Sequence, residues 1–323
     1  MLASGLRCPL DNVEALLSPR IQFTAVVVVA TLLLVATEQL RARPQPIAAA
    51  KQPGSKTRVR FRVPSADELR DSAFRTSALR GRAILLATRD SLPRNVGNSL
   101  RCASCHLNEG LQANAMPWVG TYARFPQYRA RSGKVDLIED RINDCFLRSM
   151  NGRALNPVGR DMRDIVSYLA FLSNGLPVGA DMEGQGLPRL QVMPGDPARG
   201  AGVFSSTCVR CHGATGQGTA LAPPLWGPKS YNVGAGMARI ITAASFIHAL
   251  MPIDRAQRLT PQQAFDVATY INTRPRPNFP PKSNDWPHGG KPPDADYRVL
   301  PAPLPPKSAT NPSRAQARQT AHP

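Results

Sequence analysis

The sequence predicts a mainly α-helical protein built from two tandem modules. Helix-like stretches occur at residues 67–88 and 159–172, whereas patterns typical of β-strands are almost absent. The length of 323 residues leaves room for two modest domains. A Cys-x-x-Cys-His motif occurs twice, at residues 102–106 and 208–212, and each copy is followed by a long loop region and a closing helix. We therefore expect one structural module used twice.

The chain begins with an apolar segment. Residues 21–36 are apolar apart from Gln22, Thr24 and Thr31, and two arginines precede them. A membrane-spanning helix needs about 20 apolar residues, whereas the core of a signal peptide has about 7 to 15. We expect residues 1–40 to direct export to the periplasm, and we favour a cleaved signal peptide over a retained membrane anchor.

The rest of the chain divides by composition. Residues 41–64 form a basic, proline-containing linker, and the first module is expected at residues 65–180. Residues 181–196, rich in Gly and Pro, connect it to the second module at residues 197–278. Residues 279–323 are rich in proline, and we expect them to form a disordered tail.

The last helix of the second module has the clearest start signal. Thr260 is the expected N-cap, Pro261 occupies the first helical position, and Gln263 completes a capping-box pattern. Apolar residues follow at helical spacing. In the first module, the corresponding helix is expected to stop before Asn174 and Gly175.

The chain is strongly basic, with 40 Lys and Arg residues against 22 Asp and Glu and a formal net charge of +18. Such a charge attracts anions without selecting one. The spacing of helix-turn-helix, RNA-recognition and zinc-finger motifs is missing from the sequence, so we expect no nucleic-acid partner. Small anions and an acidic protein partner remain as candidates.

Each Cys-x-x-Cys-His motif indicates covalent attachment of a c-type haem. Two thiols at this spacing can bond both vinyl groups of a porphyrin, and the adjoining histidine then reaches the iron. The alternatives are a zinc site made from both cysteine pairs, whose separation far exceeds the usual roughly 15–20 residues, and disulfides. The residues expected to hold two covalently bound haems are Cys102, Cys105, Cys208 and Cys211 as attachment points, with His106 and His212 as proximal iron ligands.

Each haem iron also needs a sixth ligand or an open site. For the second haem, the best candidate is Met251, which precedes Pro252 and lies just before the closing helix. A thioether ligand favours the reduced iron and raises its reduction potential. His248 and Met237 are rival ligands, and Met251 as an ordinary core methionine is the structural alternative.

For the first haem, the informative residue is Cys145, which belongs to neither haem motif. Apolar residues recur every four positions through residues 138–150, and Arg141, Cys145 and Ser149 form an adjacent row with the same spacing. The thiol is therefore expected at the edge of the buried face of a helix, in line with a guanidinium and a hydroxyl.

Positive charge near this thiol favours the thiolate form. Arg131 and Arg148 add to the charge of Arg141, and a thiolate can ligate iron or act as a nucleophile. The alternatives are that Cys145 is a small buried hydrophobe and that the arginines form a solvated helix face. Met116 is a rival ligand for the same iron.

Several segments resemble the dihaem thiosulfate dehydrogenases. The first, residues 122–152, carries Phe-Pro-Gln-Tyr, Glu-Asp-Arg-Ile-Asn-Asp-Cys-Phe and Arg-Ser-Met-Asn-Gly. The second, residues 224–252, carries Pro-Leu-Trp-Gly-Pro, Ser-Tyr-Asn, Gly-Ala-Gly-Met, Phe-Ile and Met-Pro. The resemblance covers residues 79–276 and includes neither the leader nor the proline-rich tail. The segment around Cys145 is its most specific part.

The resemblance implies two cytochrome c domains, each around a covalently bound haem. By this resemblance Cys145 is the distal ligand of the first, active-site haem, opposite His106. The second haem is implied to pass electrons outward. Some members carry a lysine where this chain has Leu250, so a lysine–methionine ligand exchange is not implied. The remaining implied site residues are Arg131, Arg141 and Ser149 for substrate and His212 and Met251 for the second iron.

The implied reaction joins two thiosulfate dianions into tetrathionate and releases two electrons. Cys145 is expected to bond the sulfane sulfur of one thiosulfate, and the second thiosulfate then attacks. The expected acceptor is a soluble carrier such as a cytochrome c or a high-potential iron–sulfur protein. The alternatives are a sulfur-transfer cytochrome subunit that handles thiosulfate and a non-catalytic dihaem electron-transfer cytochrome.

Overall fold

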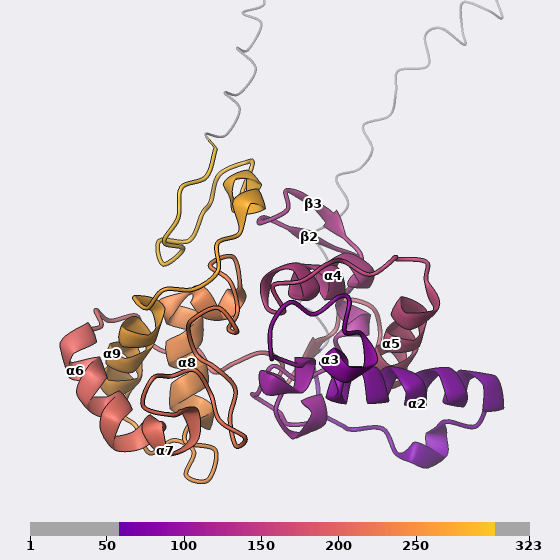
Figure 1. Ribbon diagram of the computed structural model, residues 1–323. Coiled ribbons are helices and arrows are strands. Elements are labelled where there is room, and N and C mark those ends of the chain that lie inside the picture. Colours follow the sequence, from indigo (N-terminus) through magenta and orange to yellow (C-terminus); the bar gives the residue numbers. More distant parts are fainter. Residues whose placement is uncertain (1–57, 301–323) are drawn as a thin grey trace, which may run out of the picture. The chain divides into compact units, whose positions relative to one another are not determined.

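Two lobes of helices, each with its own hydrophobic core, make up residues 58–300, the part of the chain that the computed structural model describes (Figure 1). All of these residues belong to one compact unit, Lys56–Pro323. Within residues 58–300, no helix is both long and apolar enough to cross a membrane. The expected leader at residues 1–40 lies outside the described residues.

The first lobe is built around α2 and α5, which lie side by side, with α4 and a small hairpin beside them (Figure 1). Its elements in chain order are β1 (Arg58–Val59), η1 (Ala66–Glu68), α2 (Ser72–Leu86), α3 (Thr88–Ser91), η2 (Cys102–Ser104), η3 (Asn108–Gly110), η4 (Tyr122–Arg124), β2 (Gln127–Arg129), β3 (Lys134–Asp136), α4 (Ile138–Arg148), α5 (Arg160–Phe171) and β4 (Asp181–Met182).

The second lobe is built around α6, α8 and α9. Its elements are α6 (Pro197–Val203), the π-helical turn η5 (Phe204–Cys208), α7 (Val209–His212), η6 (Gly236–Ala238), α8 (Ile240–Leu250), α9 (Pro261–Asn272) and η7 (Pro280–Asn284).

Strands are as few as the sequence predicts, and they form two small sheets. Strand β1 pairs with β4 in parallel, with Arg58 opposite Asp181, and β2 pairs with β3 as an antiparallel hairpin. The first pair joins residues that the sequence analysis assigns to two linkers. These four residues therefore add to the first module instead of only connecting it.

The same helix crossing occurs in both lobes. In the first lobe, a Cβ atom on Gly81 of α2 would lie 1.9 Å from the backbone oxygen of Asp164 on α5, and Arg80 forms an ion pair with Asp164. Only glycine allows the two backbones to approach so closely. The neighbouring arginine then reaches across the crossing to the aspartate.

In the second lobe, a Cβ atom on Gly200 of α6 would lie 2.1 Å from the backbone oxygen of Asp266 on α9. Arg199 donates from Nε and Nη2 to the Asp266 carboxylate, at 2.8 Å each. An Arg-Gly pair on the first helix and an aspartate on the closing helix thus recur, as expected of one module used twice.

Local sequence signals predict the start of one helix correctly and the start of another too early. Helix α9 begins at Pro261 with a complete capping box between Thr260 and Gln263, which confirms that prediction. The helix expected over residues 67–88 begins only at Ser72, because the Asp71 side chain caps it by accepting a hydrogen bond from the Phe74 amide. A separate 3-10 turn occupies Ala66–Glu68.

A loop of the second lobe is bonded to α4 of the first. Asn232 is fully buried, and its Nδ2 donates to the Leu147 carbonyl at 2.9 Å and to Asn151 Oδ1 at 3.1 Å. Nearby, Asn98 Nδ2 donates to the backbone oxygens of Ser149 and Ser230. These bonds hold the backbone at the end of α4 in place.

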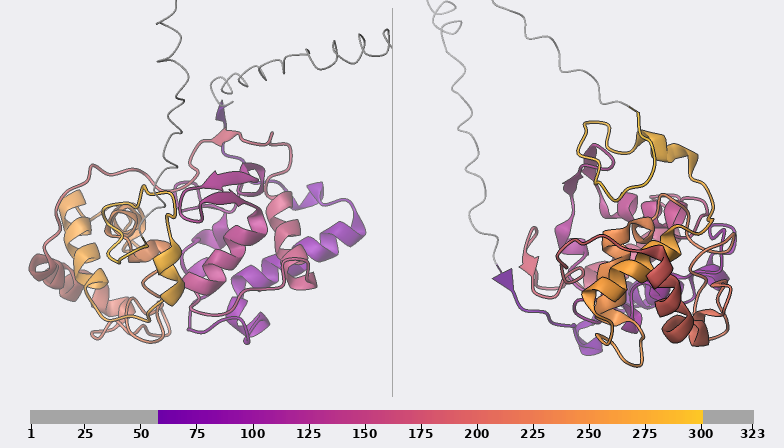
Figure 2. Two further views of the ribbon diagram at one scale, coloured as in Figure 1. Left: turned by 90° about the horizontal axis from the view of Figure 1, so that it is seen from above. Right: turned by 90° about the vertical axis from the view of Figure 1, so that its left-hand side faces the viewer.

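The expected tail differs from the observed structure over its first part. Residues 279–300 pack against the protein after α9, as the yellow segment in Figures 1 and 2. Phe279, Trp286 and Ala295 are buried, and Asp285 forms an ion pair with Arg148 on α4. Composition averaged over the whole proline-rich stretch conceals these aromatic and acidic residues. Residues 301–323 lie outside the described residues.

Candidate active site

The first Cys-x-x-Cys-His motif and the isolated cysteine line one cavity, which we call the inner cavity. The motif contributes Cys102, Cys105 and His106 to its wall, and α4 contributes Cys145. The other residues that line it are Leu85, Leu100, Arg101, Trp118, Thr121, Ile138, Arg141, Ile142, Phe146, Ser149, Met150 and Leu169. Its wall is mostly apolar, as a porphyrin requires.

The backbone holds the His106 ring in one orientation. Its Nδ1 lies 2.5 Å from the Met116 carbonyl oxygen, which can only accept a hydrogen bond. The proton is therefore on Nδ1, and Nε2 keeps the lone pair that ligates iron. Burial lowers the pKa of His106 to about 4, which keeps the ring neutral.

The surrounding loop depends on one glycine. Gly110 has φ +70°, and a Cβ atom there would lie 2.1 Å from the Trp118 ring. That ring in turn packs 5.6 Å from the His106 ring, centroid to centroid.

The rival ligand Met116 is absent from the inner-cavity wall. It packs in a cluster with Ala115 and residues of α8.

The second lobe repeats this arrangement. His212 Nδ1 lies 2.8 Å from the Pro223 carbonyl oxygen, and burial lowers its pKa below the usual value. Gly216 has φ +63°, and a Cβ atom there would lie 2.3 Å from the Trp226 ring. The two histidines are thus oriented by the same device.

The candidate sixth ligands of the second lobe lie close to one core. Met251 directly follows α8, and both Met251 and its rival Met237 pack against the cluster that also contacts Cys208. The other rival, His248, has its Nδ1 2.9 Å from the Leu259 carbonyl oxygen.

Helix α4 presents Cys145 to the inner cavity because its buried face is apolar. Ile138, Phe146 and Met150 are buried in the core of the first lobe, which confirms the predicted stripe. Arg141 Nη1 donates a hydrogen bond to Cys145 Sγ at 2.8 Å. The electrostatic interaction with Cys145 raises the pKa of Arg141 against the opposing effect of burial.

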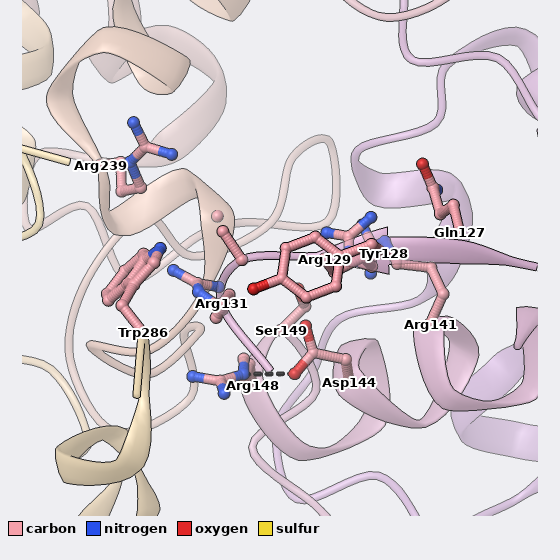
Figure 3. A pocket seen from close by; sticks show the side chains of 12 residues that line it. Gln127, Tyr128, Arg129, Arg131, Arg141, Asp144, Arg148, Ser149, Arg239 and Trp286 are labelled. Carbon is pink, nitrogen blue, oxygen red and sulfur yellow. Dashed lines mark hydrogen bonds and ion pairs between the residues drawn. The ribbon is translucent and has the colours of Figure 1, made fainter. Parts of the chain in front are cut away.

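A second cavity of about 370 Å³, the outer cavity, shares Arg141 and Ser149 with the inner one. Figure 3 shows the side chains that line the outer cavity. Arg131, the third predicted substrate residue, lines the outer cavity but not the inner one. The full lining is Gln127, Tyr128, Arg129, Ala130, Arg131, Arg141, Asp144, Arg148, Ser149, Gly236, Arg239 and Trp286. Five arginines in one wall indicate an anion site.

Four of these arginines, Arg129, Arg131, Arg148 and Arg239, form ion pairs with carboxylates. Arg148 donates to both oxygens of Asp285, at 2.9 and 2.7 Å, and also pairs with Asp144. Arg239 donates to Asp294 at 3.0 and 2.7 Å. Arg129 lies 3.5 Å from Asp136, and its pKa is lowered by burial and by the charge of Arg141.

Arg141 has no carboxylate partner within residues 58–300, and Arg131 shares its carboxylate partner, Asp285, with Arg148. Arg141 contacts the Cys145 sulfur, and among the ion pairs of residues 58–300 it takes part in none. Arg131 Nε forms a longer ion pair with Asp285 Oδ2, at 3.6 Å. The predicted pair Arg131 and Arg141 therefore makes fewer contacts with carboxylates than Arg148 does.

Known proteins are similar to this sequence over most of its length. Residues 94–178 match the family model "SoxA/TsdA, cytochrome c domain", and residues 195–271 match "Cytochrome C oxidase, cbb3-type, subunit III". A thiosulfate dehydrogenase of Allochromatium vinosum is 43% identical over 250 residues, which cover 74% of this chain and 92% of that protein. The chain belongs to the thiosulfate dehydrogenase family.

Two further members of the family support the assignment. A thiosulfate dehydrogenase of Psychrobacter arcticus is 41% identical over 241 residues, covering 72% of this chain and 74% of that protein. The solved thiosulfate dehydrogenase (TsdBA) of Marichromatium purpuratum, in its "as isolated" form, has a TM-score of 0.65 and 40% identity. The match covers 68% of this chain and 50% of that longer one.

Cytochrome c domains carry covalently bound c-type haem, and the residues here fit that group. Burial raises the pKa of the Cys102 and Cys105 thiols to about 12, so the inner cavity favours uncharged sulfur, as in a thioether. Zinc fits less well, because Cys102 and Cys208 lie against separate cores and no cluster of three or more metal-binding side chains occurs in residues 58–300.

Sequence reasoning missed several residues of the outer cavity. Arg129 could have been found, since it lies two positions before Arg131 on the same hairpin. Trp286 also carried a signal, as a large aromatic residue in a proline-rich stretch that was expected to be disordered. Arg239 carried no local signal of its position.

Proposed function

We propose that the protein binds two haems and oxidises two thiosulfate dianions to tetrathionate at Cys145. One observation carries this proposal: the Cys145 sulfur, bonded to Arg141, lies where the inner cavity of the first haem motif meets an arginine-lined cavity open to an anion. When bound, the c-type haems supply one-electron acceptors for the two electrons that the reaction releases.

Eight residues would hold the two irons and porphyrins. Cys102 and Cys105 would be bonded to the first porphyrin, with His106 and Cys145 as the iron ligands. The support is that all four line the inner cavity. In the second lobe, Cys208 and Cys211 would be bonded to the porphyrin, with His212 and Met251 as the iron ligands.

The chemistry at Cys145 balances in two steps. In the first, the Cys145 thiolate forms a bond to the sulfane sulfur of one thiosulfate, giving a cysteine S-thiosulfonate, and two electrons leave. In the second, the sulfane sulfur of another thiosulfate attacks the sulfane sulfur already bound. Tetrathionate departs, and the Cys145 thiolate is restored.

The arginines make this approach of two dianions favourable. Arg141 stabilises the thiolate, and Arg141, Arg131 and the Ser149 hydroxyl bind sulfonate oxygens, offsetting the repulsion between the two anions. Buried, pre-oriented guanidinium groups cost little reorganisation when charge accumulates.

The electrons would pass from the second lobe to a soluble periplasmic carrier. A cytochrome c or a high-potential iron–sulfur protein fits this role. Export to the periplasm would depend on the apolar segment at residues 21–36, as a cleaved signal peptide or a retained anchor.

The test compares the isolated protein with Cys145→Gly, using thiosulfate as donor and ferricyanide as acceptor. The wild type forms tetrathionate without any partner subunit, whereas the variant falls to the background rate because it lacks the sulfur nucleophile. A pyridine haemochrome assay still finds two haems in the variant. The wild-type spectrum and electron paramagnetic resonance show thiolate-ligated low-spin haem, and the variant loses that signal.

Wild-type turnover by Cys145→Gly would disprove the covalent role. A wild-type protein that forms no tetrathionate without a partner would instead favour the sulfur-transfer or electron-transfer alternatives.

A further inference from the structure

The segment after α9 forms part of the outer-cavity wall. The backbone amide of Trp286 donates to the Arg131 carbonyl at 2.8 Å, and the Trp286 side chain is only 4% exposed. Pro287 and His288 lie against Gly133, at the turn of the hairpin that carries Arg131. Figure 3 shows Trp286 beside Arg131 in the wall of the cavity.

This segment supplies most of the contacts that hold the Arg131 side chain. Its guanidinium carbon lies 4.9 Å from the centre of the Trp286 ring. Nη2 donates to the Tyr297 hydroxyl at 3.4 Å, and Nη1 donates to the Gly234 carbonyl at 3.1 Å. An arginine has many rotamers, so these contacts select one of them before an anion arrives.

The same segment leaves part of the charge of Arg131 available. Asp285 is the nearest carboxylate, but both its oxygens accept hydrogen bonds from Arg148. Its Oδ2 also accepts a bond from the Tyr297 hydroxyl at 2.6 Å. Arg131 is therefore held by an aromatic face, two neutral oxygens and a carboxylate that it shares with Arg148, so only part of its charge is compensated.

Arg141 and Arg131 lie at different depths. Arg141 lines both cavities and contacts Cys145, whereas Arg131 lines the outer cavity only. We propose that Trp286 and Tyr297 are positioning residues that hold Arg131 for the sulfonate of the second, attacking thiosulfate, while Arg141 serves the thiosulfate bonded to Cys145. This inference rests on the proposed function.

The experiment is a double-mutant cycle with Trp286→Leu and Arg131→Ala, followed by steady-state kinetics with thiosulfate and ferricyanide. Loss of the aromatic face raises the KM for thiosulfate about two- to fivefold, as expected for one cation–π contact, with a smaller change in kcat. In the Arg131→Ala background, Trp286→Leu leaves KM unchanged, because the residue through which it acts is missing.

Two milder variants guard against a loss of folding. Trp286→Phe keeps an aromatic face and raises KM less than Trp286→Leu, and Tyr297→Phe removes only the hydroxyl. Neither alters the thiolate-ligated haem signal, since these residues lie outside the inner cavity.

An unchanged KM in Trp286→Leu would overturn the inference. So would an equal rise of KM in both backgrounds, because that result would mean that Trp286 supports the fold without acting through Arg131. Both results require a wild type that forms tetrathionate. A wild type that fails to form it contradicts the proposed function itself, before any variant is compared.

Discussion

Arg148 shares its helix with Arg141 but has a different task. Its guanidinium makes two hydrogen bonds to buried Asp285, a third to Asp144, and stacks 4.5 Å from the centre of the Phe279 ring. A guanidinium with this many partners has few donors left for a substrate. It instead fastens the segment after α9 to α4.

Replacing Arg148 by Met should therefore affect stability. Asp285 would keep its charge in a buried site with its main partner removed, so we expect the free energy of unfolding to fall by about 3–5 kcal/mol. Guanidinium chloride unfolding measures the change. The double variant Arg148→Met/Asp285→Asn should recover part of it, and a loss below about 1 kcal/mol for the single variant would contradict the burial argument.

Residues on one helix were predictable from sequence, and residues joined across the chain were not. Arg141, Cys145 and Ser149 line the same cavity because helical spacing fixes their relative positions. No local pattern reveals that Asp285 pairs with Arg148, which lies far away in sequence. The sequence therefore predicted the inner part of the candidate site and part of its outer wall, and it missed the residues that the segment after α9 contributes.

At the scale of the element, local signals predicted helices better than strands. The capping box of α9 lies within four residues, so its start could be predicted to the residue. Strands β1 and β4 have only two residues each and pair across most of the first lobe. A pairing this short and this distant leaves no periodic pattern to detect.

Two glycines on α6 provide a matched test of the helix crossing. Gly200→Ala places a methyl group against the Asp266 backbone, so we expect a loss of roughly 1–3 kcal/mol in the free energy of unfolding. Gly202 on the same helix has nothing within 4 Å of such a Cβ atom, and Gly202→Ala should stabilise the protein by up to about 1 kcal/mol. Thermal unfolding of the two variants compares them directly.

The difference in melting temperature between the two variants shows how much the close helix crossing contributes to stability. Equal melting temperatures for Gly200→Ala and Gly202→Ala would show that α6 and α9 can separate at little cost. The close approach of the two backbones would then contribute little to the fold.

At the scale of the whole molecule, the net charge of +18 should affect how fast thiosulfate arrives. A cationic protein with an arginine-lined cavity raises the local concentration of a dianion, and salt screens this attraction over about 10 Å at 0.1 M. We expect kcat/KM for thiosulfate to fall as sodium chloride increases. Reduction by an uncharged hydroquinone is the control and should change much less; equal salt dependence of the two reactions would contradict steering.

The helix crossing that occurs in both lobes places recognisable residues on either side of each Cys-x-x-Cys-His motif. A haem-binding pentad lies in the interior of its lobe, so it reveals how many lobes a chain has and leaves their limits open. An Arg-Gly pair upstream of the pentad and an aspartate downstream, as at Arg80 with Asp164 and at Arg199 with Asp266, bracket the pentad. A fragment of this chain intended to hold one lobe alone should therefore include both members of its crossing.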